Sequence, residues 1–352
     1  MLINHTIRQW FSKAQTISFN NDTKALPDLA LAYLNRQIQL LSHHPHYQVT
    51  IQTALQERRS QWMQGAVPNS LVILSSPSEN LSVIINQVVQ EEQDERIHKL
   101  FLLQASPDRN NLIQQISKLN LHAANTEKQL VVIPSLDAFF LRTIAGLEIM
   151  EQFLDVVNSF PTCFWLIGCN RWTWQYLDAV SQFASYFDAT VQLPKLTGDQ
   201  LHSWLSSLLG ELTLDWGAES SEAQEGRSQR YFENLAQLSL GLSQVAAHLW
   251  IHSLRYPQPD QQDEEESSSP LLSEVILKVR PAVLPDLPSL IAEDRFLLYA
   301  LLLHRQMKGD QLALSLGEPQ GKVRAQCRQL LQTGILSFQQ GDLTVHPAYY
   351  PR

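Results

Sequence analysis

The sequence has 352 residues, of which 44% are hydrophobic and 17% charged, and its formal net charge is -9. This length and hydrophobic content predict a packed globular protein of two or three domains. The negative charge argues against binding of the whole chain to nucleic acid. No stretch reaches about 18 uncharged apolar residues, so no membrane-spanning helix is predicted.

Residues 1–69 are predicted to form a helical N-terminal region. Ile3, Ile7, Trp10 and Phe11 follow a 3.6-residue period, which predicts an amphipathic helix. We expect this helix to pack on its own domain, with peripheral contact to a membrane or a partner as the alternatives. Two further helices are predicted, and they cover Leu26–Leu41 and Ile51–Met63.

Three histidines, His43, His44 and His46, stand together in this region without acidic or cysteine neighbours. We therefore expect a solvated loop and no metal site. The three cysteines, Cys163, Cys169 and Cys327, lack metal or redox spacing, which favours a reducing cytosol and a cytoplasmic protein. The first residues also lack the long apolar core of a signal peptide.

Residues 70–195 alternate between apolar strand-like runs and helical patterns, which predicts a parallel sheet with helices on both faces. The clearest helix is Ala145–Phe160, whose apolar residues share one face. The predicted strands are Leu71–Leu74, Lys99–Leu103, Gln129–Ile133, Cys163–Gly168 and Ala189–Gln192.

The segment Leu71–Ser82 has the strand, turn and helix order of a phosphate-binding loop with the consensus G-x-x-x-x-G-K-[ST]. Aligned on this consensus, Ser75 and Asn80 replace the two glycines, Leu81 replaces the lysine, and Ser82 supplies the hydroxyl. A register one residue later places Ser76, Leu81, Ser82 and Val83 at these positions, also without a lysine. Loss of the lysine alone is expected to weaken phosphate binding about ten- to a hundredfold. Glu79 would also place a carboxylate near the anion.

Four later stretches follow this loop in the order of known ATPase motifs. Lys128–Arg142 resembles a Walker B strand, Phe164–Trp172 a sensor-1 strand, Leu193–Leu205 the junction to a helical lid, and Leu240–Trp250 the lid helix. Residues 70 to about 255 therefore resemble the P-loop ATPase core of the AAA+ and STAND families in its degenerate form.

The resemblance also identifies the positions that depart from these families. Pro134 and Ser135 occupy the acidic positions of Walker B, and Ser243 and Gln244 stand where the lid arginine is expected. Asp137 lies two residues beyond the acidic position. The resemblance thus implies a pseudo-ATPase without catalytic residues, cofactor or metal. Its vestigial nucleotide pocket would be formed by Ser75, Ser76, Asn80, Ser82, Asn170 and Arg171.

Several of these residues also have simpler structural interpretations. Asp137 is predicted to cap a helix or to pair with Arg142 at the surface. Arg171 could act as a sensor, but we expect it to form hydrogen bonds at the strand ends. The tryptophans Trp165, Trp172 and Trp174 are expected to fill the core or gaps between domains, with ligand stacking as the alternative.

Residues 196–282 are expected to form a helical lid interrupted by mobile acidic loops. Asp215–Arg230 and Pro257–Pro270 are rich in Ser, Gln and acidic residues, so they bury too little apolar surface to offset their ordering entropy. The acidic run Asp263–Glu266 could bind a basic partner, although we expect a solvated tether.

Residues 283–352 show three helical patterns followed by two strands, an order that resembles a winged-helix domain. The helix expected to read DNA in such a domain carries Lys322, Arg324 and Arg328 on its outward face. From Glu293 to Arg352 there are seven basic and five acidic residues, which is a small positive excess for contacts to phosphates. Docking of a protein on this face is therefore favoured over DNA. The predicted elements are helices Glu293–Gln306, Asp310–Leu316 and Gln320–Thr333 and strands Ile335–Gln339 and Leu343–His346.

Together these features predict an α/β protein with a degenerate P-loop core, a helical N-terminal region, a helical lid and a C-terminal winged helix. We expect a scaffold or regulatory subunit that binds another protein and is not an enzyme. A DNA-associated regulator and an unconventional ATP/ADP switch are the alternatives. The sequence leaves the partner and the oligomeric state open.

Overall fold

The computed structural model describes residues 23–26, 28–40, 43–65, 69–91, 99–103, 111–119, 121, 128–187, 189–207, 213–257, 276–339 and 341–351. The predicted N-terminal amphipathic helix and the acidic run Asp263–Glu266 lie outside these residues.

The chain forms two compact units, each built from separate stretches. The first contains residues 1–42 and 195–286, and the second contains residues 43–194 and 287–350. This grouping differs from the four consecutive segments expected from the sequence. In the first unit, β1 (Thr23–Ala25) pairs with β8 (Leu254–Pro257), which joins the N-terminal residues to the predicted lid.

The second unit is built on the predicted five-stranded parallel sheet, which confirms the α/β fold class. Its strand order is β3-β4-β5-β2-β6, so the strand that comes first in the sequence lies between two late ones. The carboxyl ends of β2, β4 and β5 therefore meet at one edge, where ligands bind in sheets of this kind. The strands are β2 (Ser70–Ser75), β3 (Lys99–Leu102), β4 (Gln129–Ile133), β5 (Cys163–Asn170) and β6 (Thr190–Gln192).

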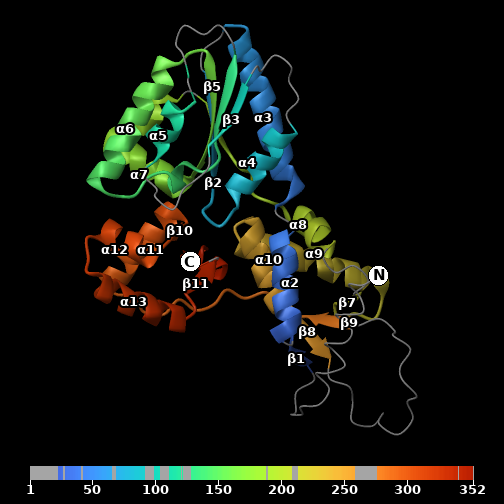
Figure 1. The fold of residues 1–352 in the computed structure, drawn as a ribbon. Helices are drawn as coiled ribbons and strands as arrows, with labels where there is room; N and C mark the ends of the chain where they lie inside the picture. Colours follow the sequence, from blue (N-terminus) through green and yellow to red (C-terminus); the bar gives the residue numbers. More distant parts are fainter. Residues whose placement is uncertain are drawn as a thin grey trace. The chain divides into compact units, whose positions relative to one another are not determined.

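Helices cover both faces of this sheet (Figure 1). On one face, α5 (Leu112–Ser117), α6 (Ile144–Ser159) and α7 (Arg171–Ser181) pack against alternate residues of β4 and β5 such as Val131 and Trp165. On the other face, α3 (Pro45–Met63) and α4 (Leu81–Gln90) contact the sheet, and Trp62 stacks on Phe164 at 5.5 Å. Burial on both faces explains why β2, β4 and β5 are largely apolar runs.

The second unit also contains a C-terminal domain, residues 287–350, that has the predicted three helices and hairpin. Helices α11 (Ala292–His304), α12 (Gly309–Leu316) and α13 (Gln320–Gln332) precede β11 (Leu336–Gln339) and β12 (Asp342–Val345). A two-residue strand, β10 (Gln306–Met307), pairs with the free side of β12 and gives the order β10-β12-β11.

In the part of the first unit that the structure describes, there are four helices and a small sheet that was not predicted. The helices are α2 (Asp28–Leu40), α8 (Gly198–Ser206), α9 (Ser221–Leu238) and α10 (Ser243–Ser253), and the sheet has the order β1-β8-β9-β7. Its remaining strands are β7 (Thr213–Asp215) and β9 (Ile276–Val279).

The prediction of a mobile loop over Asp215–Arg230 is wrong, because α9 begins at Ser221. The side chain of Ser220 caps this helix by accepting from the amide of Ala223 (3.3 Å). The buried Phe232 then anchors α9, and Trp216 packs on the same ring at 5.9 Å. A low apolar content was enough for a helix here because the few apolar residues lie on one face.

The prediction of a solvated histidine loop is wrong for His43 and His44, whereas His46 is exposed. His43 and His44 are buried, and the ring of His44 caps α3 by accepting from the amide of His46 (3.1 Å). None of the helices in the described part of the chain is both long and apolar enough to cross a lipid bilayer.

Candidate functional site

The loop that follows β2 uses its own backbone amides for internal hydrogen bonds. The amide of Glu79 donates to the carbonyl of Ser76, and the amide of Leu81 donates to the carbonyl of Glu79, both over 3.0 Å. A phosphate-binding loop needs amides that point toward the anion, arranged by alternating right- and left-handed residues. No residue from Ser75 to Ser82 has a positive φ, so the loop does not form this anion cradle.

Side-chain burial makes the same region unsuitable for a phosphate. Glu79 is 2% exposed and Leu81 is 4% exposed. The carboxylate of Glu79 is therefore built into the loop, where it disfavours a second negative charge. Leu81, which stands at the lysine position in the first register, faces the core beside Ile84 and Ile85 of α4. A cation at this position would not reach solvent or a ligand.

The side chain of Asn80 is held by a residue of the C-terminal domain. Nη1 of Arg305 donates to Oδ1 of Asn80 over 3.0 Å, and Oγ of Ser82 donates to the same oxygen over 3.3 Å. The hydroxyl that would bind a metal ion in an intact P-loop is thus engaged with Asn80. Arg305 brings the positive charge that the loop itself lacks.

Arg305 adopts an unusual backbone conformation, with φ 62° and ψ -52°. A bulky residue at positive φ costs on the order of 1–3 kcal/mol and persists only where the surroundings hold it. The hydroxyl of Thr344 on β12 donates to the carbonyl of Arg305 over 3.1 Å, which fixes the turn between α11 and β10. The residue with the strained backbone, Arg305, is thus the same residue whose side chain contacts the loop after β2.

Asn170, predicted as part of the vestigial nucleotide pocket, lies at the end of β5 and has two structural roles. Its Oδ1 caps α7 by accepting from the amides of Trp172 (2.8 Å) and Thr173 (3.0 Å). Its Nδ2 donates to the carbonyl of Leu303 at the end of α11 over 2.6 Å. The hydroxyl of Thr173 donates to the same carbonyl. Both polar ends of Asn170 are therefore occupied by backbone groups.

His304, the residue after Leu303, also contacts the turn that follows β4. Its Nε2 accepts from the amide of Arg142 over 3.2 Å, which leaves Nδ1 to donate toward the carbonyl of Asp137 at 3.4 Å. The ring also packs on Phe140, with centroids 5.0 Å apart. In addition, Nη2 of Arg142 donates to the carbonyl of Ser315 in α12 over 3.0 Å.

The structure corrects the predicted pairing of Asp137 with Arg142. Asp137 is buried, and its Oδ1 accepts from the amide of Asn170 over 3.2 Å, because the 3-10 turn after β4 directs the carboxylate toward the end of β5. The expected hydrogen bonds of Arg171 at the strand ends are not found among the described residues. Its guanidinium lies over the ring of Trp172 at 5.5 Å. The prediction that Trp165 and Trp174 fill the core is confirmed.

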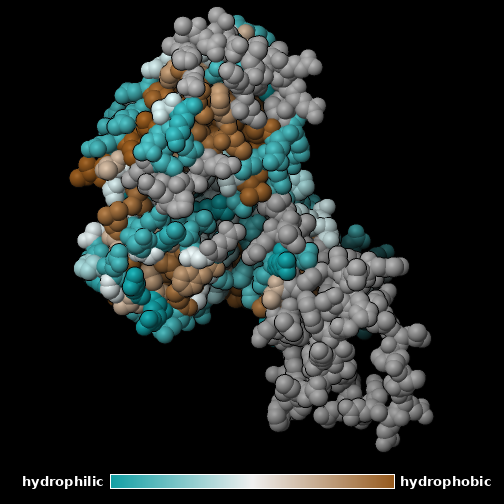
Figure 2. Space-filling view, in the orientation of Figure 1, coloured by the Kyte–Doolittle hydropathy of each residue, from teal (hydrophilic) through white to brown (hydrophobic). Residues whose placement is uncertain are grey.

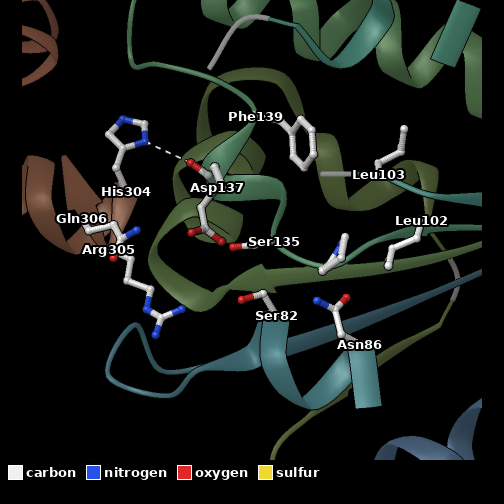
Figure 3. A pocket seen from close by; sticks show the side chains of 12 residues that line it. Ser82, Asn86, Leu102, Leu103, Ser135, Asp137, Phe139, His304, Arg305 and Gln306 are labelled. Carbon is white, nitrogen blue, oxygen red and sulfur yellow. Dashed lines mark hydrogen bonds between the residues drawn. The ribbon is translucent and has the colours of Figure 1, made fainter. Parts of the chain in front are cut away.

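A cavity of about 300 Å³ remains beside these contacts (Figure 3). One side is polar and comes from the C-terminal domain, with His304, Arg305 and Gln306. Ser82 and Asn86 of α4 and Asp137 form further polar walls, while Leu102, Leu103 and Phe139 form an apolar wall. Of the predicted pocket residues only Ser82 lines this cavity, since Asn80 and Asn170 are engaged in the contacts described above.

The described residues contain no group of three or more His, Cys, Asp or Glu side chains that could hold a metal ion. Among the described residues, Asp137 is the single acidic wall residue of the cavity. Mg²⁺ in phosphate sites is usually held by one or two carboxylates together with phosphate oxygens. One carboxylate is the minimum for such a site, and Oδ1 of Asp137 already accepts from the amide of Asn170.

No family model matches the sequence, and no curated protein matches it. Among solved structures, the RuvB Holliday junction branch migration motor of Thermotoga maritima is similar at 15% identity and a TM-score of 0.35, covering 90% of this chain and 91% of that one.

Two proteins of Aeropyrum pernix are also similar. The ORC2 protein, solved with ADPNP and ADP, shows 10% identity and a TM-score of 0.37, covering 95% of this chain and 93% of its own. The ORC1 protein, solved in complex with DNA, shows 9% identity and a TM-score of 0.36, covering 93% and 94%. At these values the function has to be argued from the residues of this chain.

Leu303, His304 and Arg305 were not predicted as site residues. They follow one another at the end of α11, where the local pattern shows only the last turn of an amphipathic helix. The one local signal is Arg305, a basic residue directly after the helix, and basic residues are common at that position. Only the packing of the C-terminal domain on the sheet edge brings these residues to the loop after β2.

Proposed function

We propose that this chain is a catalytically inactive AAA+/STAND-like protein that works as a scaffold or regulatory subunit by binding another protein. The observation that carries the proposal is the loop after β2, whose amides of Glu79 and Leu81 are used internally. A loop that uses these two amides internally and has neither a lysine nor a glycine lacks several of the contacts that bind a triphosphate.

The C-terminal domain supports this interpretation, because its residues occupy polar groups that a nucleotide would use. Asn80 is bound by Arg305, and Asn170 is bound to Leu303. A nucleotide would have to displace these contacts before it could form its own, which lowers its apparent affinity. The α/β core then serves as a rigid support for the surfaces around it.

Calorimetry with ATP and with ADP, each in the presence of Mg²⁺, tests whether the core binds nucleotide. A phosphate-release assay tests whether it hydrolyses ATP. The full chain is expected to release no binding heat at millimolar nucleotide and no phosphate above the buffer blank. A P-loop ATPase with intact motifs serves as the positive control. ATP turnover that is lost in Ser82→Ala or Asp137→Asn would show that the proposal is wrong.

The scaffold role needs a separate measurement. The chain is expected to form a stoichiometric complex with a protein partner that survives size-exclusion chromatography after both components are purified. Repeated captures that return only the bait would count against this part of the proposal while leaving the nucleotide result unchanged.

A further inference from the structure

An apolar groove lies on the surface of the C-terminal domain between α13 and the β11–β12 hairpin. We call it the α13 groove, and it is lined by Val323, Cys327, Leu331, Phe338 and Leu343. Its volume is about 370 Å³, which holds two or three apolar side chains. All of these residues belong to the second unit.

Phe338 extends the apolar surface of this groove into solvent. Its side chain is 63% exposed, although it belongs to a strand, and β11 is the outer strand of its sheet. Figure 2 shows apolar side chains gathered over α13 and β11 on this face. An exposed aromatic ring beside an apolar hollow is typical of the centre of a protein interface.

Arg324 and Arg328 form a basic rim along the groove. They lie one helical turn apart on α13, and both contribute to its lining. No acidic side chain is among the described residues that line the groove. The rim therefore presents positive charge to whatever occupies the apolar centre.

Lys322 does not belong to this face, although the sequence groups it with the two arginines. Its Nζ bonds Oε1 of Glu318 over 2.8 Å, and this hydrogen bond raises the pKa of the lysine. Lys322 also lines a different cavity, together with Glu293 and Glu318. The basic face that the sequence predicted for a protein partner, with DNA as the alternative, is therefore divided, and two of its cations, Arg324 and Arg328, lie beside an apolar surface.

This composition favours a peptide over duplex DNA. DNA binding needs several cations that follow the phosphates, whereas a protein interface needs an apolar centre with a charged rim. We propose that the α13 groove binds a segment of a partner protein that carries two or three apolar side chains flanked by Asp or Glu. The inference rests on the proposed scaffold function and names the chemistry of the partner.

Selection from a random 12-residue display library on the immobilised full chain tests the groove. Enriched peptides are expected to combine aliphatic or aromatic residues with Asp or Glu. A labelled synthetic peptide of the enriched sequence then gives the Kd by fluorescence anisotropy. Phe338→Ser and the double variant Arg324→Glu/Arg328→Glu are each expected to weaken binding about tenfold or more.

Matched controls exist in the same domain. Leu314 on α12 is 64% exposed but does not line the groove, so Leu314→Ser is expected to keep the wild-type affinity. Arg295 on α11 is an exposed arginine outside the groove, so Arg295→Glu is the control for charge reversal. Circular dichroism of all variants checks that the fold is retained.

Three outcomes would overturn the inference: no enriched sequence, an enriched sequence rich in Lys and Arg, or equal loss of binding in the control variants. Salt-dependent duplex binding that is abolished by Arg324→Glu/Arg328→Glu would show a nucleic-acid face instead. The nucleotide measurements remain independent of the peptide selection. A chain that hydrolyses ATP but still selects acidic peptides would contradict the proposed inactive core and leave the α13 groove as a peptide site.

Discussion

Arg305 and Asn80 are 225 positions apart in the sequence, yet the guanidinium of one donates to the side-chain oxygen of the other over 3.0 Å. Asn80 is the N-cap of α4, and Arg305 is the C-cap of α11. The contact joins the C-terminal domain to the loop in which an intact P-loop would hold its phosphate. It also explains why a strained backbone is retained at Arg305.

Two substitutions of Arg305 distinguish the effect of its hydrogen bond to Asn80 from the effect of its strained backbone. Arg305→Ala loses the hydrogen bond and keeps a side chain at positive φ, whereas Arg305→Gly loses the bond and relieves the strain. We expect the glycine variant to be more stable than the alanine variant by about 1 kcal/mol in urea unfolding. Equal stabilities would mean that the conformation of Arg305 carries no strain. Neither variant is expected to gain ATP binding.

Asn170 allows its two roles to be tested separately. Asn170→Asp keeps an oxygen that caps α7 but places a carboxylate against the carbonyl of Leu303. Asn170→Ala loses both interactions. Both variants are expected to lose about 1–3 kcal/mol of unfolding free energy, while Gln329→Ala on the exposed side of α13 changes little. Wild-type stability of Asn170→Asp would show that the bond to Leu303 contributes nothing.

Introducing a lysine at position 81 is not expected to restore ATP binding. Leu81→Lys would place an ammonium group at a position that is 4% exposed, so the unfolding free energy should fall by about 2–5 kcal/mol. Leu81→Met, which conserves the volume, should cost less than about 1.5 kcal/mol. Chemical denaturation gives both values, and calorimetry should detect no ATP binding by the lysine variant. A stable lysine variant that binds ATP would contradict the account of this loop.

Gly168 is required where β5 passes the turn after β4. A Cβ added there would lie 2.2 Å from the carbonyl oxygen of Pro134 and 2.6 Å from Cδ1 of Ile85. Gly168→Ala is therefore expected to cost more than about 2 kcal/mol, measured by thermal or urea unfolding. Gly321 in α13 has nothing within 4 Å of an added Cβ, so Gly321→Ala should be neutral or stabilising by up to about 1 kcal/mol.

The burial of His43 predicts a dependence of stability on pH. Burial lowers the pKa of His43, while the hydrogen bond with Gln48 and the charge of Glu91 act in the opposite direction. The folded state therefore favours the neutral ring, and the unfolded state binds the proton more tightly. Stability is retained above pH 6.5, the ordinary pKa of histidine, and decreases as the pH falls below it.

Urea midpoints at pH 7.5 and pH 5.5 measure this effect. His43→Leu should show a smaller decrease between the two values than the wild type. His46→Gln changes an exposed histidine three positions away and should keep the wild-type decrease. An unchanged pH dependence in His43→Leu would exclude His43 as the cause.

The central strands β2, β4 and β5 of the parallel sheet could be predicted because a buried parallel strand is a local feature. Each of the three is a short, largely apolar run, which can be recognised without information about its neighbours. The missing lysine and glycines between Ser75 and Ser82 are likewise visible in the sequence alone. The prediction of a mobile loop failed at α9 because it rested on composition. Composition does not show that Phe232 and Leu235 share one buried face of the helix.

Neighbouring positions in the chain are enough to predict that the core is an α/β sheet and that its phosphate loop lacks the usual residues. The contacts of Arg305 with Asn80 and of Asn170 with Leu303 become apparent only in the folded chain, as does the separation of Lys322 from Arg324. These relationships depend on which surfaces meet when the C-terminal domain packs on the sheet edge. Hydrophobic patterns indicate that a surface is buried, but they do not indicate which other surface packs against it.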